Sequence, residues 1–128
     1  MQHMNWSPML SAPYTIDADA ELVERIACDD MVRGVTISCG GFFGPQGRRL
    51  RVPLAFPDQN TLVESFCYDG WKITNYEMES SAVAGLSRLM GHKAVTVCLV
   101  IANRLVQSAD IDYNKKMKEL IATVLDRM

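Results

Sequence analysis

The pattern of apolar and polar positions predicts four helices and three strands. Helices are expected over 17–34, 58–66, 78–90 and 113–128, with Gly34 and Gly91 closing the first and third. Shorter β-branched runs predict strands over 35–39 and 71–75. The run Ala94–Ala102 is apolar except for Thr96, which is typical of a strand buried on both faces.

Helices and strands alternate along the chain, which predicts a layered α/β fold. We expect a largely parallel or mixed sheet flanked by helices, in a single domain over residues 1–128. The segment 40–57 holds four of the eight glycines and three of the five prolines and is therefore expected to be mostly loop. Ligands of such folds bind beyond the carboxyl ends of the strands. Three places follow from this rule: the loop after Cys39, the junction 75–79, and the segment 102–104.

Composition narrows the class of protein. The chain has 128 residues, 48% apolar and 22% charged, as expected of a globular domain with its own core. Its 13 basic and 15 acidic side chains argue against a nucleic-acid partner. No apolar stretch is long enough to cross a membrane, and no signal peptide is visible, so we expect a soluble cytoplasmic protein. The four cysteines lack metal-ligand spacing, which favours reduced, buried thiols and no metal.

The loop after the first strand carries the first candidate residues. Within Gly40–Leu50 these are Phe42, Phe43, Gln46 and Arg48. A carboxamide such as that of Gln46 donates and accepts side by side and so matches the amide edge of a pyrimidine. Arg48 can donate to a ring carbonyl, and Phe42 offers a stacking face. The alternative is an ordinary surface loop with solvated arginines, and this segment alone favours that alternative.

The junction between the second strand and the next helix carries two carboxylates. Glu77 and Glu79 flank Met78 at the helix entry, where the helix dipole favours the ionised form. An ionised carboxylate there could accept hydrogen bonds from vicinal sugar hydroxyls. The alternative is ordinary helix capping by acids. A glycosidase pair is disfavoured because acids two residues apart rarely flank a scissile bond properly.

The exit of the third strand is the third place. Ile101 and Ala102 could wall a flat ligand, and Arg104 could reach back to the first loop. The alternative is simple strand termination. Because all three places are expected at one edge of the sheet, together they favour a nucleoside-like ligand.

Three short motifs occupy these places: Phe42-Phe-Gly-Pro-Gln-Gly-Arg48, Asn75-Tyr-Glu-Met-Glu-Ser80 and Val100-Ile-Ala-Asn-Arg104. In this order and at this spacing they resemble the uridine phosphorylases of the nucleoside phosphorylase family. The similarity runs from about Ala12 to the end and corresponds to the C-terminal portion of the family's fold. Purine-cleaving relatives carry an aspartate after the last strand, where this chain has Ile101-Ala-Asn103. The missing aspartate counts against a purine or methylthioadenosine nucleosidase.

The resemblance implies reversible phosphorolysis of uridine to uracil and ribose 1-phosphate. Inorganic phosphate would be the co-substrate, no cofactor would be needed, and the protein would be a homo-oligomer. Arg48 would stabilise negative charge on the departing uracil and Glu79 would bind the ribose hydroxyls, as the two catalytic residues. The implied substrate-binding residues are Phe42, Gln46, Arg48, Glu77, Met78, Glu79, Ile101, Ala102 and Arg104.

Members of the family are longer, and their phosphate site is built in the half that precedes the portion matched here. Two hypotheses about the function therefore remain open, one of an enzyme and one of a non-catalytic protein. The first is a uridine phosphorylase that is active when another chain supplies the remaining half. The second is a truncated, non-catalytic α/β module that retains a partial nucleoside pocket or serves in oligomerisation.

Overall fold

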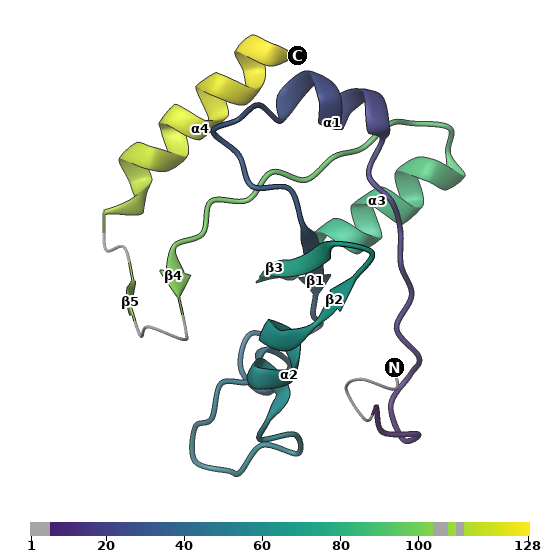
Figure 1. Ribbon diagram of the computed structural model, residues 1–128, viewed down its shortest axis with the longest axis vertical. Helices are drawn as coiled ribbons and strands as arrows, with labels where there is room; N and C mark the ends of the chain where they lie inside the picture. The colour runs from purple at the N-terminus through teal and green to yellow at the C-terminus, as the bar shows by residue number, and fades with distance from the viewer. Residues whose placement is uncertain (1–5, 104–107, 110–111) are drawn as a thin grey trace.

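A computed structural model describes residues 6–103, 108–109 and 112–128. Helices and strands alternate over most of it, which confirms the expected α/β class (Figure 1). The helices are α1 (Ala20–Ile26), α2 (Gln59–Ser65), α3 (Ser80–Leu89) and α4 (Tyr113–Arg127), with a single 3₁₀ turn η1 (Gly44–Gln46). The strands are β1 (Val35–Ser38), β2 (Cys67–Tyr68), β3 (Trp71–Glu77), β4 (Ala102–Asn103) and β5 (Ser108–Ala109).

The main sheet is mixed and has the order β1-β3-β2. β1 and β3 run parallel, with Ser38 beside Glu77 at their carboxyl ends. β2 and β3 form an antiparallel hairpin around Asp69 and Gly70, whose φ angles of 48° and 80° suit the tight turn that an Asp-Gly pair favours. The apolar pattern did not predict β2, although the Asp69-Gly70 pair is a signal for it.

The first helix is shorter than expected. Asp19 caps α1 by accepting a hydrogen bond of 3.0 Å from the Leu22 N–H, but the helix ends at Ile26, well before Gly34. Asp29 and Asp30 follow, and carboxylates there would oppose the negative end of the helix dipole. Arg127 of α4 instead donates to the Ile26 carbonyl over 2.9 Å and pairs with Asp30 at 3.0 Å. These contacts join the end of α1 to the end of α4.

The prediction of a buried strand over Ala94–Ala102 is wrong. Residues 94–101 lie outside any strand, and Thr96, Cys98, Val100 and Ile101 are exposed. Ala102 belongs to β4, which pairs with β5 in a separate two-stranded sheet. An apolar run becomes a strand only where a neighbouring strand takes up its backbone hydrogen bonds. The described part of the chain offers residues 94–101 no such neighbour.

Few side chains are buried. In the described part of the chain, the core consists of Ile26 and Val63, together with the polar Gln46. The expected burial of the cysteines is accordingly wrong for three of the four, since Cys28, Cys67 and Cys98 are exposed and Cys39 is half-buried. The chain follows an open arc, with α1 and α4 at one end and α2 at the other (Figure 1). None of the described helices is long and apolar enough to cross a membrane.

Candidate functional site

Two of the three expected places meet at one edge of the main sheet. Because β1 and β3 are parallel, their carboxyl ends lie side by side, and the loop 40–48 and residues 78–79 emerge there together. Cys39 links the two segments: its N–H donates to the Glu77 carbonyl over 2.9 Å, and its thiol lies 3.5 Å from the Pro45 carbonyl oxygen. This edge is therefore where the fold assembles its candidate site.

The tight turn η1 shapes the loop. Gly47 has a φ of +67°, in the left-handed region that favours glycine, and its N–H donates to the Gly44 carbonyl over 2.9 Å. The Arg48 N–H then donates to the Phe43 carbonyl over 2.9 Å. This backbone reversal brings the side chain of Arg48 back over the residues that precede the turn.

Phe42, Gln46 and Arg48 form one contiguous group. The Arg48 guanidinium lies 3.5 Å above the centre of the Phe42 ring, where a cation–π attraction holds it. Its Nη1 donates to the Phe42 carbonyl over 2.6 Å and to Gln46 Oε1 over 2.9 Å. Gln46 is only 3% exposed, whereas Phe42 is exposed. The structure thus brings together the three residues that the sequence assigned to a pyrimidine base.

Helix α2 ties this loop to β3. Gln59 Nε2 donates to the Pro45 carbonyl over 2.6 Å, and Asn60 Nδ2 donates to the Gly47 carbonyl over 3.4 Å. The Tyr76 hydroxyl in turn donates to Asn60 Oδ1 over 3.2 Å. These supporting residues were not predicted, because hydrogen bonds between a helix and a distant loop leave no pattern in local residue spacing.

Glu77 is locked in place by four hydrogen bonds. Its Oε1 accepts from the hydroxyls of Ser38 and Ser80, the latter over 2.6 Å, and its Oε2 accepts from the N–H groups of Glu79 and Ser80 over 2.7 and 2.6 Å. Burial alone would raise the pKa of Glu77, but these hydrogen bonds outweigh it and lower that pKa to about 2. The carboxylate therefore joins the end of β1 to the start of α3.

Ser38 extends this network to the next residue of α3. Its hydroxyl oxygen accepts the Ser81 N–H over 2.9 Å and lies 3.1 Å from the Ser80 hydroxyl. Neither Ser38 nor Ser80 was predicted as a site residue. No capping-box pattern marks Ser80, because in that pattern the serine or threonine precedes the acid by three residues and here the acid comes first.

Met78 and Glu79 differ from Glu77 in being open to a ligand. Both side chains are exposed at the sheet edge. The Glu79 carboxylate accepts no hydrogen bond from the described residues, although the residue stands at the N-terminal cap of α3. Of the two acids in this motif, only Glu79 therefore has a carboxylate available for ligand hydroxyls.

The third expected place does not join this edge. Ile101 and Ala102 are exposed, and Ala102 lies in the β4–β5 sheet, which is drawn well away from β1 and β3 in Figure 1. Arg104 lies outside the described residues. The candidate site is therefore assembled from two segments, without the wall that Ile101 and Ala102 were expected to supply.

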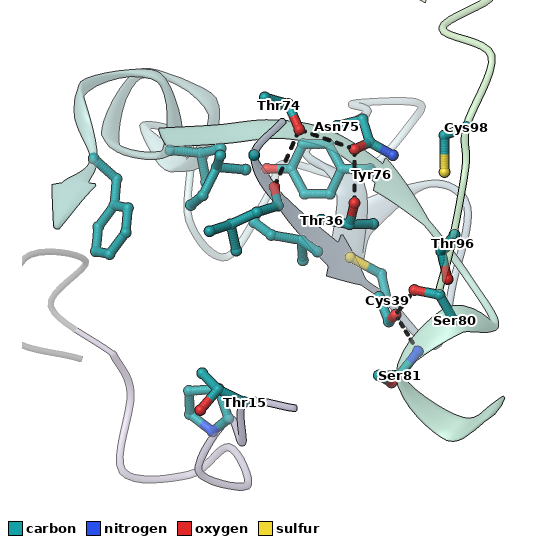
Figure 2. Close-up of a pocket in the computed structure, with 18 of the residues that line it drawn as sticks. Thr15, Thr36, Cys39, Thr74, Asn75, Tyr76, Ser80, Ser81, Thr96 and Cys98 are labelled. Carbon is teal, nitrogen blue, oxygen red and sulfur yellow. Dashed lines mark hydrogen bonds between the residues drawn. The ribbon is translucent and has the colours of Figure 1, made fainter. Parts of the chain in front are cut away.

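A large hollow opens beside the site. It has a volume of about 2750 Å³ and is lined by the stretches 10–18, 32–40, 50–56 and 94–100, among others; we call it the central hollow. Figure 2 shows Thr15 facing Thr36 and Cys39 across it, and Thr96 and Cys98 passing close to Ser80 and Asn75. Arg48 is the one member of the Phe42, Gln46 and Arg48 group that reaches its wall.

Comparison with known families identifies the superfamily to which this fold belongs. The model of the phosphorylase superfamily matches residues 3–128. The chain belongs to this superfamily. Among the residues that the structure describes, no group of three or more metal-ligating side chains lies beside the candidate site or elsewhere.

Two relatives place the chain near the uridine-cleaving phosphorylases. It is 31% identical over 94 residues to uridine phosphorylase A of Schistosoma mansoni, a match that covers 71% of this chain and 31% of the relative. Its fold matches the crystal structure of a Trypanosoma brucei nucleoside phosphorylase that shows uridine phosphorylase activity, with a TM-score of 0.78 and 27% identity. That match covers 89% of this chain and 42% of the trypanosomal one. The chain thus spans less than half the length of these phosphorylases.

Proposed function

We propose that this protein takes part in the phosphate-dependent cleavage of uridine to uracil and ribose 1-phosphate. The observation that carries the proposal is the joined group of Phe42, Gln46 and Arg48 at the sheet edge. A stacking ring, a carboxamide and a guanidinium are together the groups that recognise the flat, amide-edged ring of a pyrimidine. The relationship to uridine phosphorylase A supports the same substrate.

The proposed chemistry needs charge stabilisation more than a protein nucleophile. Phosphate attacks C1′ of the ribose, the bond from C1′ to the base nitrogen breaks, and its electron pair leaves on uracil. Arg48, already oriented by the Phe42 carbonyl, would stabilise that negative charge without further reorganisation. Glu79, which has an open carboxylate, would accept hydrogen bonds from the ribose hydroxyls. Inorganic phosphate is the co-substrate, and the reaction needs no cofactor.

The roles proposed for Glu77 and Glu79 differ accordingly. Both oxygens of Glu77 are occupied by donors from Ser38, Glu79 and Ser80. We therefore assign Glu77 to positioning the Met78–Glu79 corner and Glu79 to contacting the sugar. Met78 would pack beneath the ribose, as its exposed position next to Glu79 permits.

Uridine turnover and uracil binding test this function separately. The chain is incubated with uridine, with and without phosphate, and uracil is quantified; uracil that forms only with phosphate supports the proposal. Uracil binding is measured by calorimetry for Gln46→Ala and Arg48→Ala, with Arg49→Ala as the matched control. Arg49 is exposed and adjoins Arg48 in sequence, so its removal tests the loss of a charge alone.

The expected binding losses follow from the contacts. Removing Arg48 or Gln46 should weaken uracil binding at least about tenfold, because a hydrogen bond to a charged or buried polar group contributes roughly 1.5–3 kcal/mol. Arg49→Ala should stay within about twofold of the unaltered chain. Equal binding by all three variants would contradict the assigned base site. Uracil binding without turnover would support the non-catalytic nucleoside-binding module, and cleavage of inosine in place of uridine would overturn the choice of substrate.

A further inference from the structure

Two groups make up the candidate site: the proposed base site, Phe42, Gln46 and Arg48, and the proposed sugar site, Met78 and Glu79. Neighbouring residues of β3 anchor the two groups. Tyr76 hydrogen-bonds to α2, which holds the loop of the base site, whereas Glu77 accepts hydrogen bonds from N–H groups at the sugar site. Successive side chains of a strand point to opposite faces of its sheet, so the two anchors leave β3 on different sides, only one residue apart.

Two side chains of α2 carry the link from Tyr76 to the loop. The Tyr76 hydroxyl donates to Asn60 Oδ1 over 3.2 Å and accepts from Gln59 Nε2 over 3.4 Å. Gln59 Nε2 also donates to the Pro45 carbonyl over 2.6 Å, and Asn60 Nδ2 donates to the Gly47 carbonyl over 3.4 Å. All three side chains are half-buried, which shields their hydrogen bonds in part from competing water. Two carbonyls at the η1 turn are thereby fixed relative to β3.

The base site and the sugar site are each held together without this network. Phe42, Gln46 and Arg48 contact one another directly through the Arg48 guanidinium. At the sugar site, the Glu77 carboxylate accepts the Glu79 N–H over 2.7 Å. Loss of the network would therefore leave both groups intact and would release only their placement relative to each other.

We infer that Asn60 and Tyr76 are positioning residues that set the separation between the base site and the sugar site. The inference rests on the proposed function, which assigns the base to Gln46 and Arg48 and the ribose hydroxyls to Glu79. Uridine contacts both sites at once, whereas uracil contacts only the base site. A fixed separation favours the larger ligand, because the loop then has little conformational freedom to lose when uridine binds.

The test compares uridine and uracil binding in Tyr76→Phe, which removes only the hydroxyl of the link. Calorimetry is run without phosphate, so that uridine is bound and not cleaved. The variant should bind uridine at least about tenfold more weakly and uracil within about twofold, because a small displacement between two sites affects only a ligand that spans both. Tyr68→Phe is the matched control. It removes a hydroxyl from a β2 side chain that is 74% exposed and should leave both affinities within about twofold.

A second variant shows whether the two residues act through one another. Asn60→Ala should weaken uridine binding and spare uracil binding in the same way. Adding it to Tyr76→Phe should weaken uridine binding less than about twofold further, because the second change removes a link that is already broken. Losses that multiply would show independent effects and overturn the inference. Equal weakening of uridine and uracil would also overturn it, because a general loss of structure at the site produces that result.

Backbone dynamics measured without ligand separate this inference from the proposed function. In the unaltered chain, the amides of residues 46–48 should be as rigid as those of β3, with NMR order parameters of about 0.85. In Tyr76→Phe they should fall toward roughly 0.6, while those of β3 stay unchanged. Unchanged order parameters at 46–48 would overturn the inference, whatever the binding data. If these amides loosen but the unaltered chain binds neither ligand, the positioning of the loop is supported and only the proposed function fails.

Discussion

Two apolar regions of this chain behave differently. The edge formed by β1, β3 and the start of α3 is held by contacts that arise within the described chain: the β1–β3 ladder, the donors to Glu77 and the anchors from α2. The segment 94–101 is more continuously apolar, yet it forms no strand. The comparison shows that hydrophobicity gives a segment the capacity to be a strand, whereas neighbours with matching backbone groups determine whether it becomes one.

Removing the carboxylate of Glu77 should have the largest effect on the ordered region. In Glu77→Ala, the Ser38 and Ser80 hydroxyls and the N–H groups of Glu79 and Ser80 lose their acceptor. We expect a loss of about 3 kcal/mol in the free energy of unfolding, because several partly buried donors are left unsatisfied. Urea denaturation, monitored by circular dichroism, measures this loss. Glu79→Ala, which removes the exposed acid of the same motif, should change stability by less than about 0.5 kcal/mol; similar losses in both variants would contradict the locking role of Glu77.

The pH dependence of stability should come next in size. The pKa of Glu77 is lowered to about 2 in the folded chain, below the value of 4.5 for an unperturbed glutamate. Its stabilising contribution is therefore present above about pH 4.5 and is lost as the pH falls toward 2. Glu77→Gln should remove on the order of 2 kcal/mol of this acid-dependent stability, less than the full pKa shift corresponds to because solvent screens this half-buried carboxylate. Melting curves at about pH 6, 4 and 2.5 for the two chains check this, and parallel curves would show that another group carries the dependence.

The elements that the sequence predicted correctly are those whose determinants are local. The strand 35–39, the helix 58–66 and the terminal helix each carry their own spacing and end signals, and the structure contains them as β1, α2 and α4. The loop group of Phe42, Gln46 and Arg48 also forms, because a tight turn only a few residues long brings it together. Its role with a ligand stays a prediction.

Apart from β2, which the local Asp69-Gly70 pair signals, three features that the sequence did not predict depend on partners far along the chain. The early end of α1 involves Arg127, about a hundred residues away, which donates to the Ile26 carbonyl. The state of residues 94–101 depends on a neighbouring strand, which periodicity cannot reveal. The engagement of Glu77 by Ser38 required the parallel register of β1 and β3. These failures share one cause: each turns on a long-range hydrogen bond, for which apolar spacing carries no information.

Amide exchange compares the two regions directly. The Cys39 N–H, which donates to the Glu77 carbonyl over 2.9 Å, and the amides of β3 should exchange at least about tenfold more slowly than those of residues 95–100 in the isolated chain. Mass spectrometry of peptides covering 35–39, 71–77 and 94–101 measures the difference. Equal exchange would mean that the ladder of the main sheet opens as readily as a segment without strand partners, which would remove the contrast between the regions.

The turn that carries the candidate base site offers the smallest and most local perturbation. Gly47 has a φ of +67°, and an added Cβ would lie 2.6 Å from Asn60 Nδ2, so Gly47→Ala strains the backbone and displaces an anchor of the loop. Gly44, three residues earlier in the same turn, has open space where a Cβ would stand and no left-handed φ, which makes Gly44→Ala a matched control. We expect Gly47→Ala to cost about 1 kcal/mol and to weaken uracil binding severalfold, while Gly44→Ala changes stability by less than about 0.5 kcal/mol. Calorimetric titration with uracil measures the change in binding, and urea denaturation measures the change in stability. Equal stability and equal uracil binding in the two variants would mean that the left-handed turn does not hold Gln46 and Arg48 together. The geometry of the ordered edge would then depend on the anchors from α2 alone.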